Sequence, residues 1–147
     1  MHQERINAEA DDGAPKDRRL GTVVLMIDAL GRGGAERLLA LYAPELRDLG
    51  YNVRIVALQV RDGNPEAARL QALGIPVDHI ELRRIRYFRQ LMRVTRAVRE
   101  MRPSVIHAHL EAATLVGGIL RVVLAVPAVA TLHTLEHPSG LNRASLR

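Results

Sequence analysis

The stretch that decides the fold runs from residue 22 to residue 36, TVVLMIDALGRGGAE. Residues 22–28 are almost wholly apolar and rich in the β-branched side chains that favour strands. A glycine-rich turn at residues 31–34 then leads into a helix-period run that begins at Ala35. Because glycine has no Cβ and tolerates φ > 0, such a turn can bring the backbone close to a ligand.

The helix after this turn directs unpaired N–H groups and the positive end of its dipole back toward the glycines. Both features favour an anion, so we expect a phosphate-bearing ligand near Gly33 and Gly34. A tight strand-to-helix turn that binds no ligand is the alternative that the glycines alone leave open.

Strand and helix patterns alternate along the rest of the chain. We predict strands at residues 22–28, 52–58, 77–80, 105–107 and 128–132. We predict helices at residues 35–49, 65–73, 87–101 and 112–124, with Gly50 as a helix C-cap and Gly74 ending the second helix. This alternation predicts an α/β fold: a Rossmann-like, three-layer αβα domain with a parallel sheet of about five strands.

Ligands of such folds bind beyond the carboxyl ends of the strands. The candidate functional side chains fall at that edge. Asp28 and the glycine turn follow the first predicted strand, His107 and His109 follow the fourth, and His133 follows the fifth.

Composition limits the possible functions. The chain has 147 residues, 48% of them hydrophobic, which suits one domain with a real core. Aromatic residues make up only 3%, so base stacking on aromatic side chains is disfavoured and we expect no nucleic-acid partner. The absence of cysteine excludes disulfides, a thiolate nucleophile and cysteine-ligated zinc, and it agrees with a reducing cytoplasm.

The N-terminal segment is charged and lacks a signal-peptide core, so we expect residues 1–20 to form a disordered leader and residues 21–147 the domain. The longest apolar stretch, residues 115–129, is interrupted by Arg121 and Pro127. That pattern suits a buried helix and strand better than a membrane span. We therefore expect a cytoplasmic protein.

The glycine turn does not fit the two common nucleotide motifs. A dinucleotide fingerprint needs a third glycine where Glu36 stands, and an acidic residue where Leu58 and Gln59 stand. A nicotinamide or flavin cofactor is therefore only the alternative, and our prediction is no cofactor. The missing Lys-Ser or Lys-Thr pair also excludes a Walker-type loop.

The histidines raise the question of a metal. His107 and His109 are two residues apart on an extended chain, and His133 could approach from the neighbouring strand. The only nearby carboxylates are Glu111 and Glu136, so we predict no metal. The alternative for the pair is that His107 packs at the strand end while the others are exposed. For His133 we favour hydrogen bonding to a ligand phosphate or hydroxyl.

The third predicted helix is basic on one face. Along residues 83–102, the side chains that share this face are Arg86, Arg89, Arg93 and Arg96, and the other face is mostly apolar. A solvated outer face explains this pattern, and so does adhesion to anionic lipid without insertion, at about 1 kcal/mol per charge.

Four segments, in order, carry a resemblance to a known family. They are GGAERLL at residues 33–39, LGYNV at 49–53, RPSVIHAH at 102–109 and VPAVATLHT at 126–134. Together they resemble the N-terminal domain of the family 4 retaining glycosyltransferases, whose GT-B fold has two facing Rossmann-like domains. The resemblance covers most of the chain.

The resemblance implies a transferase of hexosyltransferase type, which moves a sugar from a nucleotide-sugar to a glycan or lipid-linked acceptor, commonly without a metal. It implies that Gly33 and Gly34 lie near the donor phosphates and that His133 approaches the transferred sugar as the catalytic residue. It places Glu36, His109 and Glu111 on the acceptor side.

The sequence departs from the family in one respect. The C-terminal donor domain of the family, with its basic pair and E-x7-E motif, is not in this sequence. We therefore expect half of an active site, little activity alone and a separate donor-binding domain as partner. We also expect a marginally stable or associating protein, with its arginine helix near the inner face of the membrane. A non-catalytic nucleotide- or phosphate-binding module and an inactive remnant are the alternatives.

Overall fold

The structure, a computed structural model, describes residues 20–59, 65–82 and 88–132. Strands and helices alternate along these residues. The elements are β1 (Thr22–Ala29), α1 (Gly34–Asp48), β2 (Asn52–Gln59), α2 (Pro65–Ala72), β3 (Val77–His79), α3 (Phe88–Glu100), β4 (Val105–His109), α4 (Glu111–Leu124) and β5 (Ala128–Thr131). The predicted leader falls almost wholly outside the described residues.

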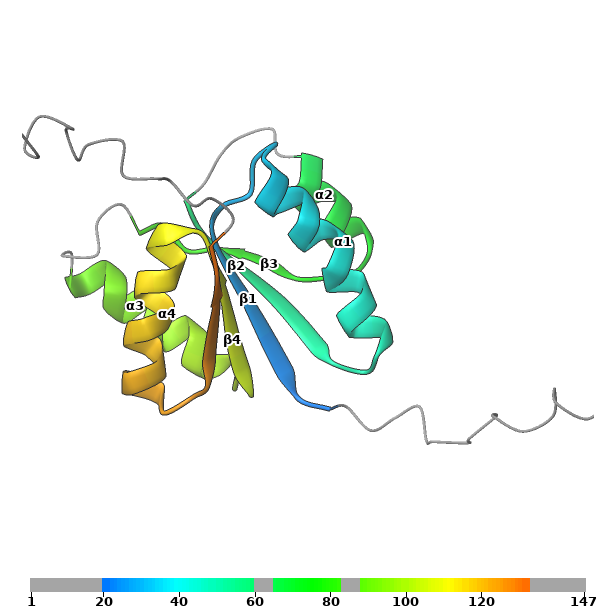
Figure 1. Ribbon diagram of the computed structural model, residues 1–147. Helices are drawn as coiled ribbons and strands as arrows, with labels where there is room; N and C mark the ends of the chain where they lie inside the picture. The colour runs from blue at the N-terminus through cyan, green and yellow to red at the C-terminus, as the bar shows by residue number, and fades with distance from the viewer. Residues whose placement is uncertain (1–19, 60–64, 83–87, 133–147) are drawn as a thin grey trace, which may run out of the picture.

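The five strands form one parallel sheet in the order β3-β2-β1-β4-β5. Helices α1 and α2 lie on one face of the sheet, and α3 and α4 lie on the other (Figure 1). This arrangement confirms the predicted Rossmann-like fold. The strand order reverses between β1 and β4, and ligands of open α/β sheets bind outside the carboxyl ends of the strands at such a reversal.

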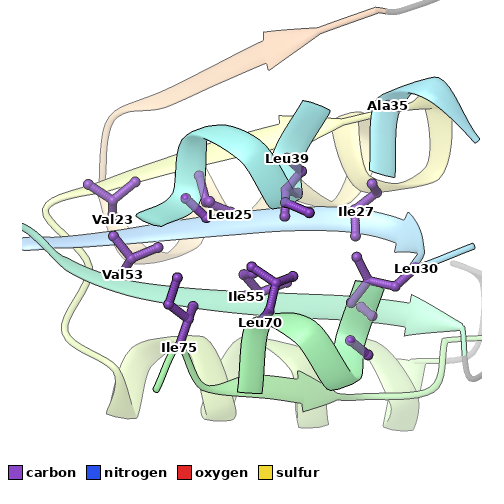
Figure 2. Packing of buried hydrophobic residues seen from close by; sticks show 14 residues of the cluster. Val23, Leu25, Ile27, Leu30, Ala35, Leu39, Val53, Ile55, Leu70 and Ile75 are labelled. Carbon is purple, nitrogen blue, oxygen red and sulfur yellow. The ribbon is translucent and has the colours of Figure 1, made fainter. Parts of the chain in front are cut away.

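Strand β1 is apolar along its length because it is buried on both faces. Val23, Leu25 and Ile27 pack under α1 and α2, as Figure 2 shows. Val24 and Met26 point the other way, into a second cluster. That cluster holds Val94 and Val98 of α3 and Val116 and Leu120 of α4. The central strand thus anchors both helical layers.

Glycines end the first two helices as the sequence predicts, with one difference in position. The C-cap of α1 is Leu49, and Gly50 follows it with φ 98°. The N–H of Gly50 donates to the Arg47 carbonyl and that of Tyr51 to the Leu46 carbonyl, which is the Schellman arrangement. After α2 the same arrangement recurs: Gly74, with φ 75°, donates its N–H to the Gln71 carbonyl, and Ile75 donates its N–H to the Leu70 carbonyl.

The fourth predicted strand is wrong in its end point. We expected it to stop at His107, with His109 beyond it, whereas β4 continues to His109. The reason is pairing: His107 lies opposite Val129, and His109 lies opposite Thr131, in the parallel ladder with β5. Other predicted boundaries differ by only one residue where they can be compared. The exception is the predicted helix start at Tyr87, which lies outside the described residues.

The two edges of the sheet differ. At one edge, Asp78 of β3 forms an ion pair with Arg54 of β2, with 2.7 Å between Oδ2 and Nη2. At the other edge, β5 has no charged residue, and both Val129 and Ala130 are exposed although they point to opposite faces. Among the described helices, none has the length and apolar character needed to cross a bilayer.

Candidate functional site

Three chain segments meet at the carboxyl edge of the sheet. Ile27 of β1 pairs with His109 of β4, and His109 pairs with Thr131 of β5. The turn into α1 follows β1, and Glu111 opens α4 two residues after His109. The fold therefore places the glycine turn and His109 at one edge of the sheet, as the sequence predicts, and Glu111 lies at the same edge.

The glycine turn requires glycine at position 33 because a larger side chain would collide with a neighbour, and not because the backbone has a positive φ. Gly33 is the N-cap of α1, with φ −78° and ψ 174°, and no glycine of residues 31–34 has a positive φ. The expected use of left-handed backbone is therefore wrong here. A Cβ on Gly33 would collide with the Glu36 carboxylate, whereas a Cβ on Gly34 would meet nothing within 4 Å.

Glu36 occupies the start of α1. It is the third helical residue, and its side chain is only 9% exposed and lies against Gly33. A carboxylate in the first turn interacts favourably with the positive end of the helix dipole. The Glu36 carboxylate therefore already occupies the start of α1. A phosphate that binds at the glycine turn would come close to this carboxylate.

A polar cluster lies between the middle of α1 and the strands β4 and β5, on the α1 face of the sheet. The Tyr42 hydroxyl shares a hydrogen bond with His109 Nε2, and His107 Nε2 shares one of 2.8 Å with Thr131 Oγ1. The two imidazole rings are 4.1 Å apart between centroids. Burial raises the pKa of the Tyr42 phenol, so that it stays protonated and hydrogen-bonded at neutral pH.

The burial of the histidine pair is the reverse of the alternative considered from the sequence. His109 is only 1% exposed, whereas His107 is half-buried. In the part of the chain that the structure describes, no three histidine, aspartate or glutamate side chains are grouped to hold a metal ion. The geometry links α1, β4 and β5 through hydrogen bonds between side chains.

Asp28 has a structural role at this edge. Its Oδ1 accepts the Ala113 N–H at 2.6 Å, and its Oδ2 accepts the Ala112 N–H at 3.2 Å. The N-cap residue of α4, Leu110, has φ 72° and supplies no side-chain cap. The carboxylate that we singled out as a functional candidate thus caps a helix from another strand.

The remaining predicted residues lie apart or outside the described residues. Glu111 is exposed at the first position of α4, at the carboxyl edge. Arg89, Arg93 and Arg96 are exposed on α3, which covers the opposite face of the sheet from α1. Arg86 and His133 lie outside the described residues.

Sequence reasoning missed two members of the polar cluster, Tyr42 and Thr131. Tyr42 lies three residues after buried Leu39 and one before buried Ala43, so the helical pattern alone assigns it to the edge of the buried face. Its partner is 67 residues away in sequence, on β4. The alternation of β5 could have placed Thr131 on the face of His107, once the strand pairing was known.

The segments that form this edge of the sheet also match a known protein family. The sequence profile of Glycosyltransferase Family 4 matches residues 32–147, which is more than half of the chain. The chain belongs to glycosyltransferase family 4. The match takes in the glycine turn, β4 and β5, and therefore every segment of the candidate site that follows β1. No curated protein sequence matches the chain.

Solved structures share the fold of this family 4 domain. MurG from Acinetobacter baumannii has a TM-score of 0.56 at 18% identity, over 76% of this chain and 35% of MurG. HepE from Anabaena, solved with UDP and glucose, has a TM-score of 0.61 at 19% identity, over 75% of this chain and 29% of HepE. The chain thus spans about a third of the length of these glycosyltransferases.

The same fold also occurs outside the family. The C-terminal domain of a hydrogenase from Pyrococcus furiosus has a TM-score of 0.54 at 14% identity, over 79% of this chain and 95% of that domain. Likeness at this identity shows the fold alone. The family 4 assignment therefore rests on the sequence profile, and the five-stranded parallel sheet agrees with a GT-B N-terminal domain.

Proposed function

We propose that this family 4 domain is the acceptor-side half of a retaining glycosyltransferase that moves a sugar from a nucleotide-sugar donor to a glycan or lipid-linked acceptor. One observation carries the proposal: the start of α1, the end of β4 and the end of β5 meet at one edge of the sheet. The solved HepE complex with UDP and glucose supports a nucleotide-sugar as donor.

In this proposal the backbone at Gly33 and Gly34 lies near the donor phosphates. Departure of the leaving group places negative charge on the nucleotide phosphate, and N–H groups directed at that charge stabilise the transition state more than the ground state. Glu36 lies against Gly33 in the structure, so its carboxylate moves to the acceptor side when the phosphate binds. That displacement makes donor binding dependent on Glu36.

The acceptor side is built from β4 and α4. The exposed carboxylate of Glu111 would accept hydrogen bonds from acceptor hydroxyls, while buried His109 would hold this side in place through Tyr42. His133 would approach the transferred sugar, two residues after Thr131, whose hydroxyl is bonded to His107. No cofactor or metal takes part in this proposal.

The transfer reaction needs a separate donor-binding domain in this proposal, so the test compares the chain alone with a mixture. UDP-glucose and GDP-mannose are offered to the chain with and without the C-terminal domain of a family 4 transferase, using a glycan acceptor. We expect transfer only in the mixture, loss of transfer in His133→Ala and retention in the matched variant His137→Ala. Transfer by the chain alone would contradict the requirement for a second domain.

Titration with UDP, GDP and NAD tests the proposal against its alternatives. We expect weak or no nucleotide binding to the chain alone, since the donor domain supplies most contacts to the nucleotide. Tight binding of NAD would favour the cofactor alternative, and tight binding of UDP or GDP without transfer in the mixture would favour a non-catalytic binding module.

We further propose that the domain works in the cytoplasm, at the inner face of the membrane, with cell-envelope glycan or lipid-linked sugar as acceptor. The exposed arginines of α3, Arg89, Arg93 and Arg96, support this placement. Sedimentation with vesicles containing phosphatidylglycerol tests it, and binding that is unchanged when all three become Glu would contradict it.

A further inference from the structure

Leu110, which joins β4 to α4, has a backbone conformation that leucine rarely adopts. Its φ is 72° and its ψ is −179°. This combination lies in a region of the backbone map that is essentially confined to glycine, which has no Cβ to collide with the adjoining chain. Such strain persists only where the surrounding structure imposes it, and it is concentrated at active sites and ligand-binding segments. The contacts around Leu110 therefore indicate what the strain serves.

The strain at Leu110 is not that of an ordinary helix end. Arg102 and Ala125, the other non-glycine residues with a positive φ in the described part of the chain, each follow the end of a helix. Left-handed backbone is common at that position, because it completes the hydrogen bonds of the last turn. Leu110 precedes a helix, so this explanation does not apply to it.

Both peptide groups of Leu110 are hydrogen-bonded. Its N–H donates to the Thr131 carbonyl at 3.4 Å. Its carbonyl accepts two bonds from Thr114, one from the backbone N–H at 3.1 Å and one from Oγ1 at 2.6 Å. The side chain of Leu110 packs against the buried cluster beneath α1 and α2. Rotation of Leu110 to ordinary backbone angles would disturb these bonds.

Hydrogen bonds also fix the chain on each side of Leu110. Before it, the imidazole of His109 is buried and shares a hydrogen bond with the Tyr42 hydroxyl of α1. After it, two backbone N–H groups in the first turn of α4 donate to the Asp28 carboxylate at the end of β1. Two different elements thus support the strained residue from both sides.

We propose that Tyr42 and Asp28 are positioning residues for acceptor recognition: they hold Leu110 in its strained conformation, which in turn sets the position of the Glu111 carboxylate. The angles of Leu110 set the direction in which the chain enters α4, and exposed Glu111 is the first residue of that helix. The inference rests on the proposed acceptor role of Glu111. The strain and its two supports can be measured without sugar transfer.

Replacement of Leu110 measures the strain. Leu110→Ala and Leu110→Gly both lose the packing of the leucine side chain, and they differ from each other only in the Cβ. We expect Leu110→Gly to melt about 5 °C above Leu110→Ala, because only glycine adopts these backbone angles freely. The matched pair is Leu38→Ala and Leu38→Gly in the middle of α1, where alanine should give the higher melting temperature. An equal or lower melting temperature for Leu110→Gly than for Leu110→Ala would overturn the strain.

Hydrogen exchange of backbone amides tests the support from Tyr42. Tyr42→Phe keeps the ring and removes the hydroxyl, so His109 loses this bond. We expect the exchange rate of the Leu110 N–H to rise about tenfold more than that of the Ile106 N–H, which donates to the Pro127 carbonyl at the other end of the β4–β5 pairing. Equal acceleration of the two amides would show only a general loss of stability, and it would refute the positioning role of Tyr42.

The same ratio of exchange rates tests the support from Asp28. Asp28→Ala should raise the rate at Leu110 relative to Ile106, because the first turn of α4 loses its acceptor. Asp48→Ala and Tyr51→Phe are the matched controls, since Asp48 is exposed at the end of α1 and Tyr51 lies between α1 and β2. A ratio that is unchanged in Asp28→Ala, or raised equally in the controls, would remove Asp28 from the proposal.

The acceptor role is tested in the mixture with a family 4 C-terminal domain. Tyr42→Phe should raise the KM for the acceptor about fivefold and leave the KM for the nucleotide-sugar unchanged, because Glu111 lies on the acceptor side. Glu111→Gln should raise the same KM, and Tyr42→Phe should then have little further effect. Independent effects of the two substitutions would contradict the link between them. Absence of transfer by the unmodified chain would refute the transferase proposal, whereas the melting order and the exchange ratio would still decide whether Leu110 is strained and supported.

Discussion

The Asp28 carboxylate accepts the Ala113 backbone N–H at 2.6 Å, although 85 residues separate the two in sequence. The bond joins the end of the central strand to the first turn of α4. Because Leu110 supplies no side-chain cap, this bond and the one to Ala112 satisfy donors that the helix start would otherwise leave open. The position of α4, and of Glu111 with it, therefore depends on β1.

Asp28→Ala should destabilise the protein by about 1–2 kcal/mol, because two N–H groups at the start of α4 lose their acceptor. Urea unfolding followed by circular dichroism measures the change. Asp48→Ala is the matched control, since Asp48 is exposed and forms its ion pair with the neighbouring, partly exposed Arg47. Equal losses in the two variants would refute the capping role.

Gly33→Ala and Gly34→Ala should act in opposite directions although the residues are adjacent. The Cβ added by Gly33→Ala displaces the Glu36 carboxylate, which costs about 1 kcal/mol, whereas the one added by Gly34→Ala enters open space in a helix and stabilises by about 0.4–1 kcal/mol. Thermal unfolding of both variants tests this. When Glu36→Ala is already present, Gly33→Ala should lower the free energy of unfolding by less than it does alone. If the two losses of stability simply add, the contact between Gly33 and Glu36 is contradicted.

Stability should fall at high pH through Tyr42. Burial raises its pKa above the value near 10 of the unfolded chain, so the contribution is complete below pH 10 and is lost as the pH rises beyond it. The slope from this group approaches about 1.4 kcal/mol per pH unit. Tyr42→Phe should flatten the decline between pH 10 and 11.5, and Tyr51→Phe controls for loss of a phenol. An unchanged slope in Tyr42→Phe would contradict the assignment.

Two adjacent leucines of α1 should contribute very different amounts to the free energy of unfolding. Leu39 is fully buried on the side of α1 that faces the sheet. Leu39→Ala should therefore lower the free energy of unfolding by about 2–5 kcal/mol. Leu38 is 47% exposed, and Leu38→Ala should cost less than about 1 kcal/mol. Equilibrium unfolding of the two variants gives the comparison, and similar costs would mean that α1 is rotated relative to the structure.

The fold could be predicted from the sequence because its signals are local. Apolar strands such as β1, helical periods such as that of α1, and Gly50 and Gly74 after helices each act within a few residues. The strand order β3-β2-β1-β4-β5 is not among these local signals, because right-handed crossovers are compatible with other orders. The end of β4 could not be predicted, because Ala108 and His109 extend the strand through pairing with β1 and β5, which lie far away in sequence.

The candidate site was predictable at its edge and not in its contacts. The sequence places the glycine turn and His109 beyond the carboxyl ends of neighbouring strands, and the structure has both at that edge. The bonds from Tyr42 to His109 and from Asp28 to α4 join residues that are 67 to 85 positions apart. Such contacts depend on how far a helix lies from a strand, which no local pattern encodes.

The contrast between the two edges of the sheet has a practical consequence. Edge strands present unpaired backbone groups to other chains, and charged side chains on the edge discourage such pairing. Strand β3 has Asp78 for this purpose, but β5 offers Ala128–Thr131, a short uncharged segment exposed on both faces. Concentrated solutions of this protein should therefore form intermolecular sheet from the β5 side first, and Val129→Lys should raise its solubility.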